Sequence, residues 1–364
     1  MTVGMARIDI DPDIQLARTP PGTFYTDPEA YEAMRTRVFS KSWQWIGVHS
    51  AVREPESTFP FTLLEGMLDE PLLLTKADDG LIRLVSNVCT HRGNLLQRKA
   101  GPCKALRCRY HGRRFDLTGQ LTYAPGFETA EDFPSESDHL PSIPMAEWGP
   151  FLFASLGPAH SFGIWIADLK RYLHWLPLGQ FRLDSTRTKD FTFDAHWALY
   201  VENYLEGFHI PFVHKGLNAA IDIQRYETEL LEWGVLQKAI AKEGQISFDL
   251  PPESPDFGKQ IAAYYFWLFP NLMLNFYPWG LSVNVVKPQG IRKTKVSFVT
   301  YVHQPQMLGR GAGADLEVVE MEDEEVVLDV QRGIGAKMYQ RGRYSPTQEQ
   351  GVHHFHRLLM EQIS

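Results

Sequence analysis

Two pairs of cysteine and histidine residues carry the clearest chemical signal in the sequence. Cys89 and His91 are separated by one residue, and Cys108 and His111 by two. Two thiolates and two neutral imidazoles can hold a [2Fe–2S] cluster in which both histidines bind the same iron. Replacing two thiolates by imidazoles lowers the negative charge at the cluster and raises its reduction potential. The four residues therefore predict a centre that passes single electrons onward.

Turn-forming residues flank both pairs. Gly93 and Gly112 follow the two pairs, and Gly101 and Pro102 lie between them. A tight turn at such residues lets backbone N–H groups point at a cluster, whose sulfurs accept hydrogen bonds. We therefore expect two short loops that hold one cofactor between them.

A structural zinc site is an alternative interpretation of these four residues. Zinc sites usually space their paired ligands as C-x2–4-C and H-x3–5-H, whereas each pair here combines one cysteine with one histidine. Coincidence is a third interpretation, but it requires two matched pairs in a chain with only three cysteines. The spacing favours the iron–sulfur cluster over both. Cys103 then has no disulfide partner in the chain, so we expect a buried, unreactive thiol in a reducing compartment.

A second set of metal-binding residue types lies near the middle of the chain. At about 100° per residue, a helix through this stretch gathers a polar face: Glu202, Asn203, Glu206 and His209. An unbroken helix would carry His214 away from His209, but Pro211 lies between them and kinks or ends a helix. The two imidazoles can then converge on one metal ion. An ordinary amphipathic helix with a wet polar face is the alternative.

An acidic residue within an apolar stripe supplies a third candidate ligand. Residues 322–338 show the period of a helix, with a stripe of Val326, Val327, Val330 and Ile334. Asp323 lies in that stripe, where a carboxylate is costly unless it is paired or bound to a metal. Two histidines and a carboxylate form the ligand set of non-haem Fe(II) oxygenases, so we expect His209, His214 and Asp323 to hold one iron. A helix N-terminal charge is the alternative for Asp323.

With these residues in place, the chain resembles the catalytic α subunits of Rieske non-haem iron oxygenases, the ring-hydroxylating dioxygenase superfamily. The resemblance covers nearly the whole length. Both cysteine–histidine pairs match the family motif, as does the pattern Asn203-x2-Glu206-x2-His209-x4-His214. Glu322-Asp323, followed by Val330-Gln331-Arg332-Gly333, is also similar to the family. The resemblance implies two cofactors, a Rieske [2Fe–2S] cluster and a mononuclear Fe(II).

The resemblance also implies a role for the acid that precedes the first histidine. In the family, an acid three residues before the first iron-binding histidine bridges it to a cluster histidine of the neighbouring subunit, and Glu206 holds that position here. An electron path between subunits implies a homotrimer or a multiple of one. Asn203 is a further candidate catalytic residue in the motif. Most members that act on aromatic rings carry Asp at the position of Glu206, so the chain is more similar to the branch that oxidises choline, carnitine or glycine betaine.

The predicted activity is that of a terminal oxygenase, which uses O2 and relayed electrons to hydroxylate or oxidatively demethylate a small organic substrate. The aromatic-rich residues 262–280, including Tyr277 and Trp279, could line its pocket. Aromatic faces attract quaternary ammonium ions by about 0.5–2 kcal/mol each, which favours a quaternary or methylated amine. Simple core packing is the alternative for these aromatics. Alternative functions are an aromatic ring-hydroxylating dioxygenase α subunit and, in other classes, a Rieske electron carrier or a zinc-stabilised binding protein.

The electrons must come from another protein. Gly309-x-Gly311-x-x-Ala314 matches a dinucleotide fingerprint only superficially, because no clear βαβ unit surrounds it. We therefore expect a separate NAD(P)H-dependent reductase, with or without a ferredoxin, as partner. The net charge of −8 argues against nucleic acid as a partner. Residues 1–15 show neither a signal peptide nor a membrane span, so we expect a cytoplasmic protein with no membrane partner.

The fold class predicted from these patterns is α+β with two domains. Short strands broken by turns indicate a small all-β Rieske domain at residues 41–156. Residues 157–364 combine helices with aromatic-rich strands around 262–280 and 281–302, which indicates a catalytic domain with an antiparallel sheet. The family implies a helix-grip arrangement for it. We expect residues 1–40 to pack on the catalytic domain.

Overall fold

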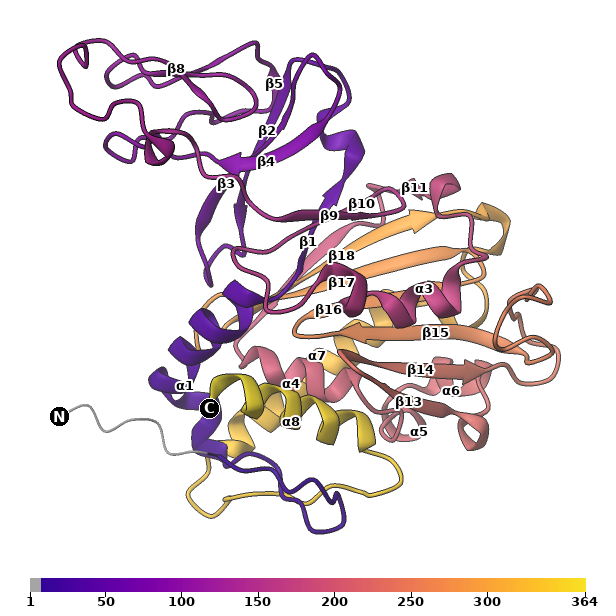
Figure 1. Ribbon diagram of the computed structural model, residues 1–364. Coiled ribbons are helices and arrows are strands. Elements are labelled where there is room, and N and C mark those ends of the chain that lie inside the picture. Colours follow the sequence, from indigo (N-terminus) through magenta and orange to yellow (C-terminus); the bar gives the residue numbers. More distant parts are fainter. Residues whose placement is uncertain (1–7) are drawn as a thin grey trace. The chain divides into compact units, whose positions relative to one another are not determined.

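The computed structural model describes residues 8–364, which form two compact units (Figure 1). One unit is Ser40–Ala159, and the other combines the segment that ends at Phe39 with His160–Ser364. Residues 1–7 of the N-terminal segment lie outside the described part of the chain. Within residues 8–364, none of the helices has the length and apolar character that crossing a bilayer requires.

The unit Ser40–Ala159 is built from short antiparallel strands. A four-stranded sheet has the order β4-β3-β2-β5, and two three-stranded sheets have the orders β1-β10-β9 and β6-β7-β8. Leu72, Leu73 and Leu74 in the central strand β3 are fully buried, so this strand contributes to the core on both faces of its sheet. The prediction of a small all-β domain is confirmed. The strands are β1 Gln44–Val48, β2 Ser57–Leu63, β3 Glu70–Lys76, β4 Ile82–Ser86, β5 Gly101–Pro102, β6 Leu106–Arg107, β7 Arg114–Phe115, β8 Leu121–Tyr123, β9 Met145–Trp148 and β10 Phe151–Ala154.

The larger unit contains an eight-stranded antiparallel sheet with the order β11-β18-β17-β16-β15-β14-β13, in which β12 also pairs with β18. Every residue of β15 and β16 is buried, as expected for the aromatic-rich segments that the sequence placed in central strands. The strands are β11 Arg182–Leu183, β12 Lys189–Phe193, β13 Glu227–Leu231, β14 Gly234–Ile240, β15 Ile261–Leu268, β16 Leu272–Tyr277, β17 Gly280–Pro288 and β18 Thr294–Val302.

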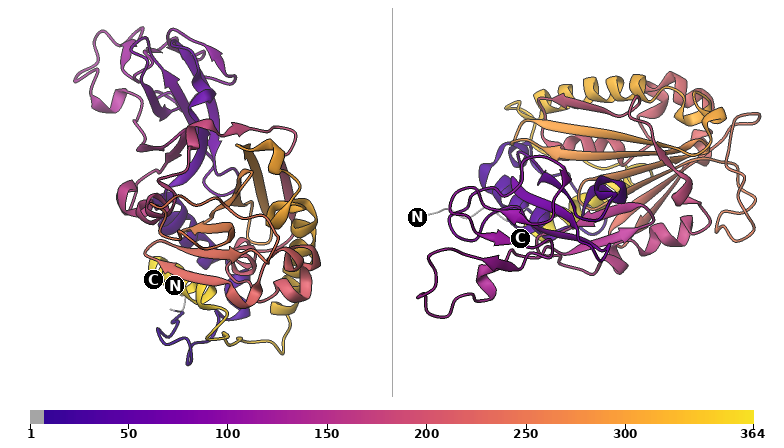
Figure 2. Two further views of the ribbon diagram at one scale, coloured as in Figure 1. Left: turned by 90° about the vertical axis from the view of Figure 1, so that its right-hand side faces the viewer. Right: turned by 90° about the horizontal axis from the view of Figure 1, so that it is seen from above.

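Helices pack against this sheet and confirm the α+β class. Helix α4 contacts both α7 and strand β17, and α8 contacts α4 and β13 (Figures 1 and 2). The arrangement is that of a helix-grip domain, in which long helices lie across an antiparallel sheet. The helices are α1 Pro28–Ala33, α2 Phe162–Trp165, α3 Ala167–Leu173, α4 Trp197–Tyr204, α5 Ile210–Val213, α6 Lys215–Ala220, α7 Leu316–Ile334 and α8 Gln350–Ile363.

Helix α7 differs from its predicted bounds. It begins at Leu316 instead of residue 322, and it ends at Ile334, just before Gly335. Val330, predicted to face the core, is 41% exposed, while Gln331 is buried. The side chain of Gln331 accepts a hydrogen bond from the backbone N–H of His196 at 2.7 Å, which explains why a polar residue turns inward.

Candidate metal centres and active site

The two cysteine–histidine pairs lie on loops that share the same backbone hydrogen bonds. In each loop, the cysteine carbonyl accepts from the N–H of a glycine four residues later, at 3.0 Å for Gly93 and 3.1 Å for Gly112. The N–H of Cys89 and that of Cys108 each donate to the carbonyl five residues later, at 2.9 Å. Both glycines have left-handed backbone, with φ of 69° and 78°. The matched turns therefore depend on residues without a Cβ.

The four side chains of the loops suit a shared cofactor. Cys89 and Cys108 are buried, while His91 and His111 lie nearer the surface with ring centroids 4.7 Å apart. Burial raises the pKa of Cys108, but backbone N–H groups of Tyr110 and His111 outweigh burial and lower it, which favours the thiolate. The buried Nδ1 of His91 has no hydrogen-bond partner among residues 8–364. A sulfide-bridged iron pair fits this donor set and would satisfy that nitrogen.

Cys103 is a free thiol that packs against the hydrophobic cluster containing Cys89 and Cys108. Its Sγ accepts a hydrogen bond from Nε2 of Gln97 at 3.2 Å and donates one to the carbonyl of Ala105 at 3.4 Å. The side chain is half-buried instead of buried as predicted. It follows the two-residue strand β5 at the edge of a sheet, where the core covers one side only.

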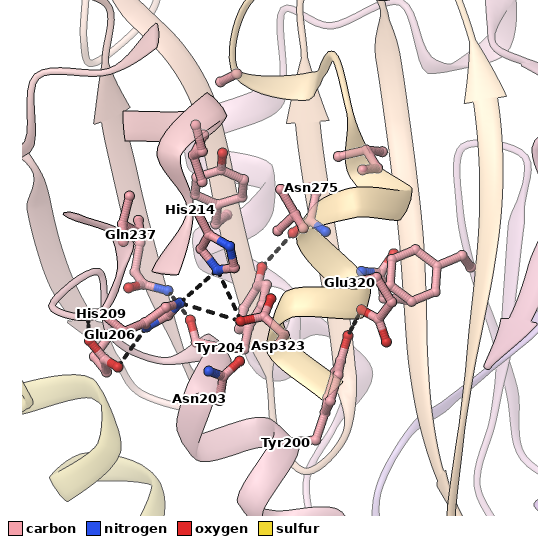
Figure 3. A pocket seen from close by; sticks show the side chains of 18 of the residues that line it. Tyr200, Asn203, Tyr204, Glu206, His209, His214, Gln237, Asn275, Glu320 and Asp323 are labelled. Atoms are coloured by element: carbon pink, nitrogen blue, oxygen red, sulfur yellow. Dashed lines mark hydrogen bonds and ion pairs between the residues drawn. The ribbon is translucent and has the colours of Figure 1, made fainter. Parts of the chain in front are cut away.

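The structure brings together the three side chains predicted to bind one iron (Figure 3). Nε2 of His214 lies 3.1 Å from Nε2 of His209 and 3.0 Å from Oδ1 of Asp323. The remaining pair, Nε2 of His209 and Oδ1 of Asp323, is 3.5 Å apart. Ligands about 2.1 Å from a metal and at right angles to one another lie roughly 3 Å apart. The spacing of the three donor atoms therefore fits ligands of one metal ion.

Each histidine of this site is held at its other nitrogen by a carboxylate. Nδ1 of His209 lies 2.7 Å from Oε1 of Glu206, and Nδ1 of His214 lies 2.7 Å from Oε2 of Glu322. Such a contact fixes the tautomer that leaves Nε2 free for a metal, and it raises the basicity of the ligand. Glu322 was not assigned this role from the sequence. The sequence feature that could have indicated this role is the position of Glu322 directly before Asp323.

The predicted continuous helix from Glu202 to His209 is wrong. Helix α4 ends at Tyr204, and the short helix α5 begins after His209. Glu206 instead caps a turn, because its Oε2 accepts from the backbone N–H of His209 at 3.0 Å. Gly207 packs so closely on Tyr226 that a Cβ there would lie 2.9 Å from the ring. The turn still places the side chains of Glu206 and His209 in contact.

Pro211 also acts differently from the prediction. It lies in the first turn of α5, where its missing N–H has no intrahelical partner to lose. Pro211 therefore helps to start a new helix and does not kink an existing one. The two histidines converge because His209 precedes α5 and His214 follows it.

Electrostatics at the site favour a cation between the three side chains. Burial lowers the pKa of His209, but hydrogen bonds to Asp323 and Glu206 outweigh burial and raise the pKa to about 9. Burial raises the pKa of Asp323, yet hydrogen bonds from the two histidines dominate and lower it. The carboxylates therefore draw positive charge to this point, and a divalent ion would supply that charge while the imidazoles stay neutral.

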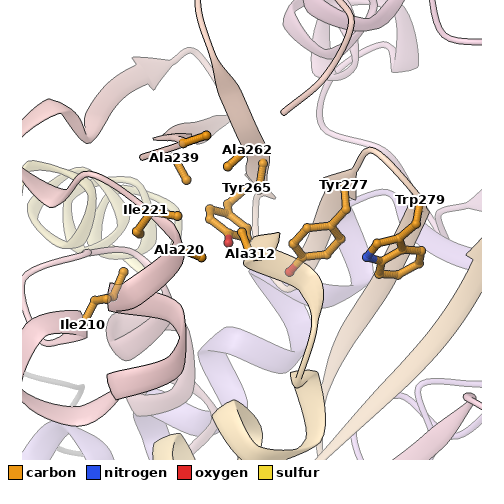
Figure 4. Close-up of a cluster of buried hydrophobic side chains, with 11 residues drawn as sticks. Ile210, Ala220, Ile221, Ala239, Ala262, Tyr265, Tyr277, Trp279 and Ala312 are labelled. Carbon is orange, nitrogen blue, oxygen red and sulfur yellow. The ribbon is translucent and has the colours of Figure 1, made fainter. Parts of the chain in front are cut away.

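A cavity opens beside the three side chains, and five tyrosines contribute to its wall. Tyr204 is the last residue of α4 (Figure 3), and Tyr265 and Tyr277 lie on strands of the sheet (Figure 4). Tyr226 lies just before β13. Trp279 stacks on Tyr277 with ring centroids 5.1 Å apart, but it borders a neighbouring cavity. We did not predict Tyr204 and Tyr226 as pocket residues from the sequence, because both lie far from the aromatic-rich residues 262–280.

Polar residues complete the wall of the cavity. Asn203, predicted as a candidate catalytic residue, lines it together with Gln237 and Asn275. The hydroxyl of Tyr204 donates to Oδ1 of Asn275 at 2.6 Å, which fixes the phenol against the sheet. Glu320 also lines the cavity and was not singled out in the sequence. The chamber combines aromatic faces, amide groups and three carboxyl groups, those of Glu206, Glu320 and Asp323.

Two family models match the chain. The Rieske [2Fe-2S] domain matches residues 42–137, and the ring hydroxylating alpha subunit (catalytic domain) matches residues 173–364. Choline monooxygenase from Arabidopsis thaliana is 32% identical, over 96% of this chain and 85% of that protein. The carnitine monooxygenase oxygenase subunit of Escherichia coli K12 is 28% identical, over 95% of this chain and 94% of that protein.

Solved structures share the same fold. The quaternary ammonium Rieske monooxygenase CntA in complex with L-carnitine superposes with a TM-score of 0.76 at 22% identity, covering 98% of this chain and 100% of that chain. Naphthalene 1,2-dioxygenase from Rhodococcus sp. superposes with a TM-score of 0.72 at 19% identity, covering 95% of this chain and 94% of that chain. At these identities the likeness establishes the arrangement of the chain.

Proposed function

Because this chain belongs to the Rieske-type ring-hydroxylating oxygenases, we propose that it hydroxylates or oxidatively demethylates a small quaternary or methylated amine. The chain is an oxidoreductase, and the family implies a Rieske [2Fe–2S] cluster and a mononuclear non-haem iron. Hydroxylation of a C–H bond places one oxygen atom of O2 in the product and releases the other as water. When bound, the two cofactors would supply O2 activation and the electrons that this reaction consumes.

We assign the cofactor ligands from the donor atoms described above. The cluster would be held by Cys89, His91, Cys108 and His111. The iron would be held by His209, His214 and Asp323, which line the same cavity as the tyrosines. Burial of the triad excludes bulk water from the reacting centre, because the His214 side chain is 1% exposed and that of Asp323 15%.

We also propose that Glu206 connects the iron site to a cluster in a neighbouring subunit. One of its oxygens contacts Nδ1 of His209, and its side chain keeps 14% of its surface exposed. Phe208 and Phe212 beside it are 47% and 78% exposed, which suits burial against another copy. A structure of CntA is described as giving insight into inter-subunit electron transfer. The assembly would be a homotrimer or a multiple of one.

The substrate class is supported by the tyrosine-lined cavity beside the triad. Quaternary ammonium ions cannot donate an N–H hydrogen bond, so a protein recognises them with aromatic faces and nearby negative charge. Rings of Tyr204 and Tyr277 flank that of Tyr265, with centroids 6.5 Å and 5.9 Å away. Choline and carnitine, the substrates named for the relatives, both carry such a group.

The remaining partners are proposals of the same kind. A separate NAD(P)H-dependent reductase, with or without a ferredoxin, would deliver electrons to the cluster, and the cytoplasm would be the location.

We propose domain limits at residues 41–156 for the cluster domain and 157–364 for the catalytic domain, with residues 1–40 packing on the latter. The division at Ser40–Ala159 into compact units supports these limits.

Oxygen uptake in the presence of a reductase tests the proposed function. The purified protein, loaded with iron and sulfide, is mixed with choline, carnitine, glycine betaine or naphthalene. We expect O2 consumption that depends on a methylated amine, and formaldehyde release separates demethylation from hydroxylation elsewhere. Uptake with naphthalene alone would favour the aromatic dioxygenase. Cluster reduction without any substrate-dependent uptake would favour an electron carrier.

A further inference from the structure

Glu320 is a buried carboxyl group in the wall of the substrate cavity. It lies on α7 three residues before Asp323 and is 3% exposed. Its Oε2 accepts a hydrogen bond from the hydroxyl of Tyr200 at 2.5 Å (Figure 3). Its Oε1 is buried and has no hydrogen-bond partner in the described chain, residues 8–364. One oxygen of the group is therefore held in place while the other is left without a partner.

The surroundings of Glu320 do not explain a carboxyl group at this position. Burial raises its pKa well above the usual range, although the Tyr200 hydroxyl acts in the opposite direction, so the group needs a cation beside it to be ionised. The ion pairs found within residues 8–364 do not include Glu320. Leaving a buried carboxyl oxygen unpaired costs free energy that an apolar residue would avoid. The missing partner must therefore come from outside the described chain.

The other acids of the cavity are already engaged. Glu206 contacts His209, and Asp323 contacts both His209 and His214. A ferrous ion bound by two neutral imidazoles and one carboxylate keeps a net positive charge, which repels a cationic substrate. Tyrosine faces offset part of that repulsion, but they carry no net charge. Unlike Glu206 and Asp323, Glu320 has neither a hydrogen bond nor an ion pair with His209 or His214 within residues 8–364, and its buried Oε1 lacks a hydrogen-bond partner there.

We propose that Glu320 determines specificity for cationic substrates by placing its carboxylate opposite the quaternary ammonium group. This inference rests on the proposed function, since it concerns the recognition of the same substrate class. Tyr200 positions the carboxylate from α4, and the tyrosine rings surround the methyl groups. The ligand class is a small organic cation without N–H groups, and an uncharged molecule of the same shape gains nothing from Glu320.

A pair of isosteric ligands isolates the charge. Choline and 3,3-dimethylbutan-1-ol have the same shape, but the second carries carbon in place of the charged nitrogen. Calorimetric titration of the anaerobic, metal-loaded protein measures both dissociation constants without turnover. For Glu320→Gln we expect choline affinity to fall by roughly 30-fold or more, with the affinity for the alcohol unchanged or higher. Glu325→Gln, an exposed acid on the same helix, should match the unaltered protein.

The outcomes separate this inference from the proposed function. If the unaltered protein binds choline no better than the alcohol, the proposed substrate class is wrong. If the unaltered protein prefers choline and Glu320→Gln keeps that preference, the role of Glu320 is wrong and the proposed function stands. Should Glu320→Gln fail to fold, Tyr200→Phe gives the test, because it removes the hydroxyl that holds the carboxylate. An unchanged preference for choline in well-folded Tyr200→Phe would then overturn the inference.

Discussion

The cluster loops and the iron site gather their donor atoms in opposite ways. The cluster residues all fall within residues 89–111, and backbone hydrogen bonds repeated in both loops shape them. In the iron site, His214 and Asp323 are 109 positions apart, and side chains of Glu206 and Glu322 orient the histidines. A local turn therefore builds one site, whereas the other forms where α7 meets the two residues that flank α5. Substitutions should affect the two centres separately.

The largest effect is expected for His209→Ala. Removing one of three donors should abolish substrate-dependent O2 uptake, because two protein ligands hold a ferrous ion poorly. Iron content should fall from about three to about two atoms per chain, while the visible absorbance of the cluster persists. His174→Ala, at an exposed position of the same unit, serves as the control. Loss of the cluster absorbance in His209→Ala would show that the two centres are not independent.

Glu206→Gln and Glu322→Gln form a matched pair, because each removes a carboxylate 2.7 Å from the Nδ1 of one histidine. We expect either change to weaken iron binding by about 10- to 100-fold. With iron in excess both metals should bind, and then Glu206→Gln alone should slow reoxidation of the reduced cluster in a stopped-flow single turnover. Equal reoxidation rates in the two variants would discard the bridging role of Glu206.

Gly112→Ala should disturb only the cluster loops. Its φ of 78° is strained for any residue with a Cβ, at a cost of about 1–2 kcal/mol. Gly80→Ala in the turn before β4 carries a similar strain, with φ of 75° and open space around it, and so controls for lost stability. Labile sulfide and the cluster's electron paramagnetic resonance signal should fall in Gly112→Ala alone. Equal sulfide loss in both would mean that stability governs cluster loading.

The smallest effect is expected for Cys103→Ser. The thiol makes two hydrogen bonds that a hydroxyl can also make, so the free energy of unfolding should change by about 1 kcal/mol or less. The cluster spectrum should not change. A shifted spectrum would place Cys103 in contact with the cluster and would contradict the assignment of the other two thiols as its ligands.

The sequence predicted what local patterns encode. The cysteine–histidine pairs and the buried aromatic strands depend on neighbours a few residues away, and the structure agrees with both the loops and the strands. Asp323 could be placed near the histidines because a carboxylate in an apolar stripe needs a cation. The structure brings these three side chains together, and their role as iron ligands stays a prediction.

Longer-range features could not be predicted in the same way. The periodicity through Glu202 and His209 suggested one helix, but the contact of Gly207 with Tyr226 accompanies a turn that the pattern did not reveal. Val330 is exposed although we predicted that it faces the core. Gln331 is buried because its side chain accepts a hydrogen bond from the N–H of His196, which lies 135 positions away in the sequence. Such partners become visible only after the chain has folded.

Two residues of helix α7 contact His214, so the geometry of the proposed iron site depends on how this helix is rotated about its axis. Consecutive residues of α7 contact the two nitrogens of this ring, Glu322 at Nδ1 and Asp323 at Nε2. Inserting a single residue between Leu316 and Glu322 would rotate both contacts by about 100° relative to the start of the helix. Length changes during evolution should therefore accumulate in the connection at 303–315, upstream of α7, and be rare within its first two turns.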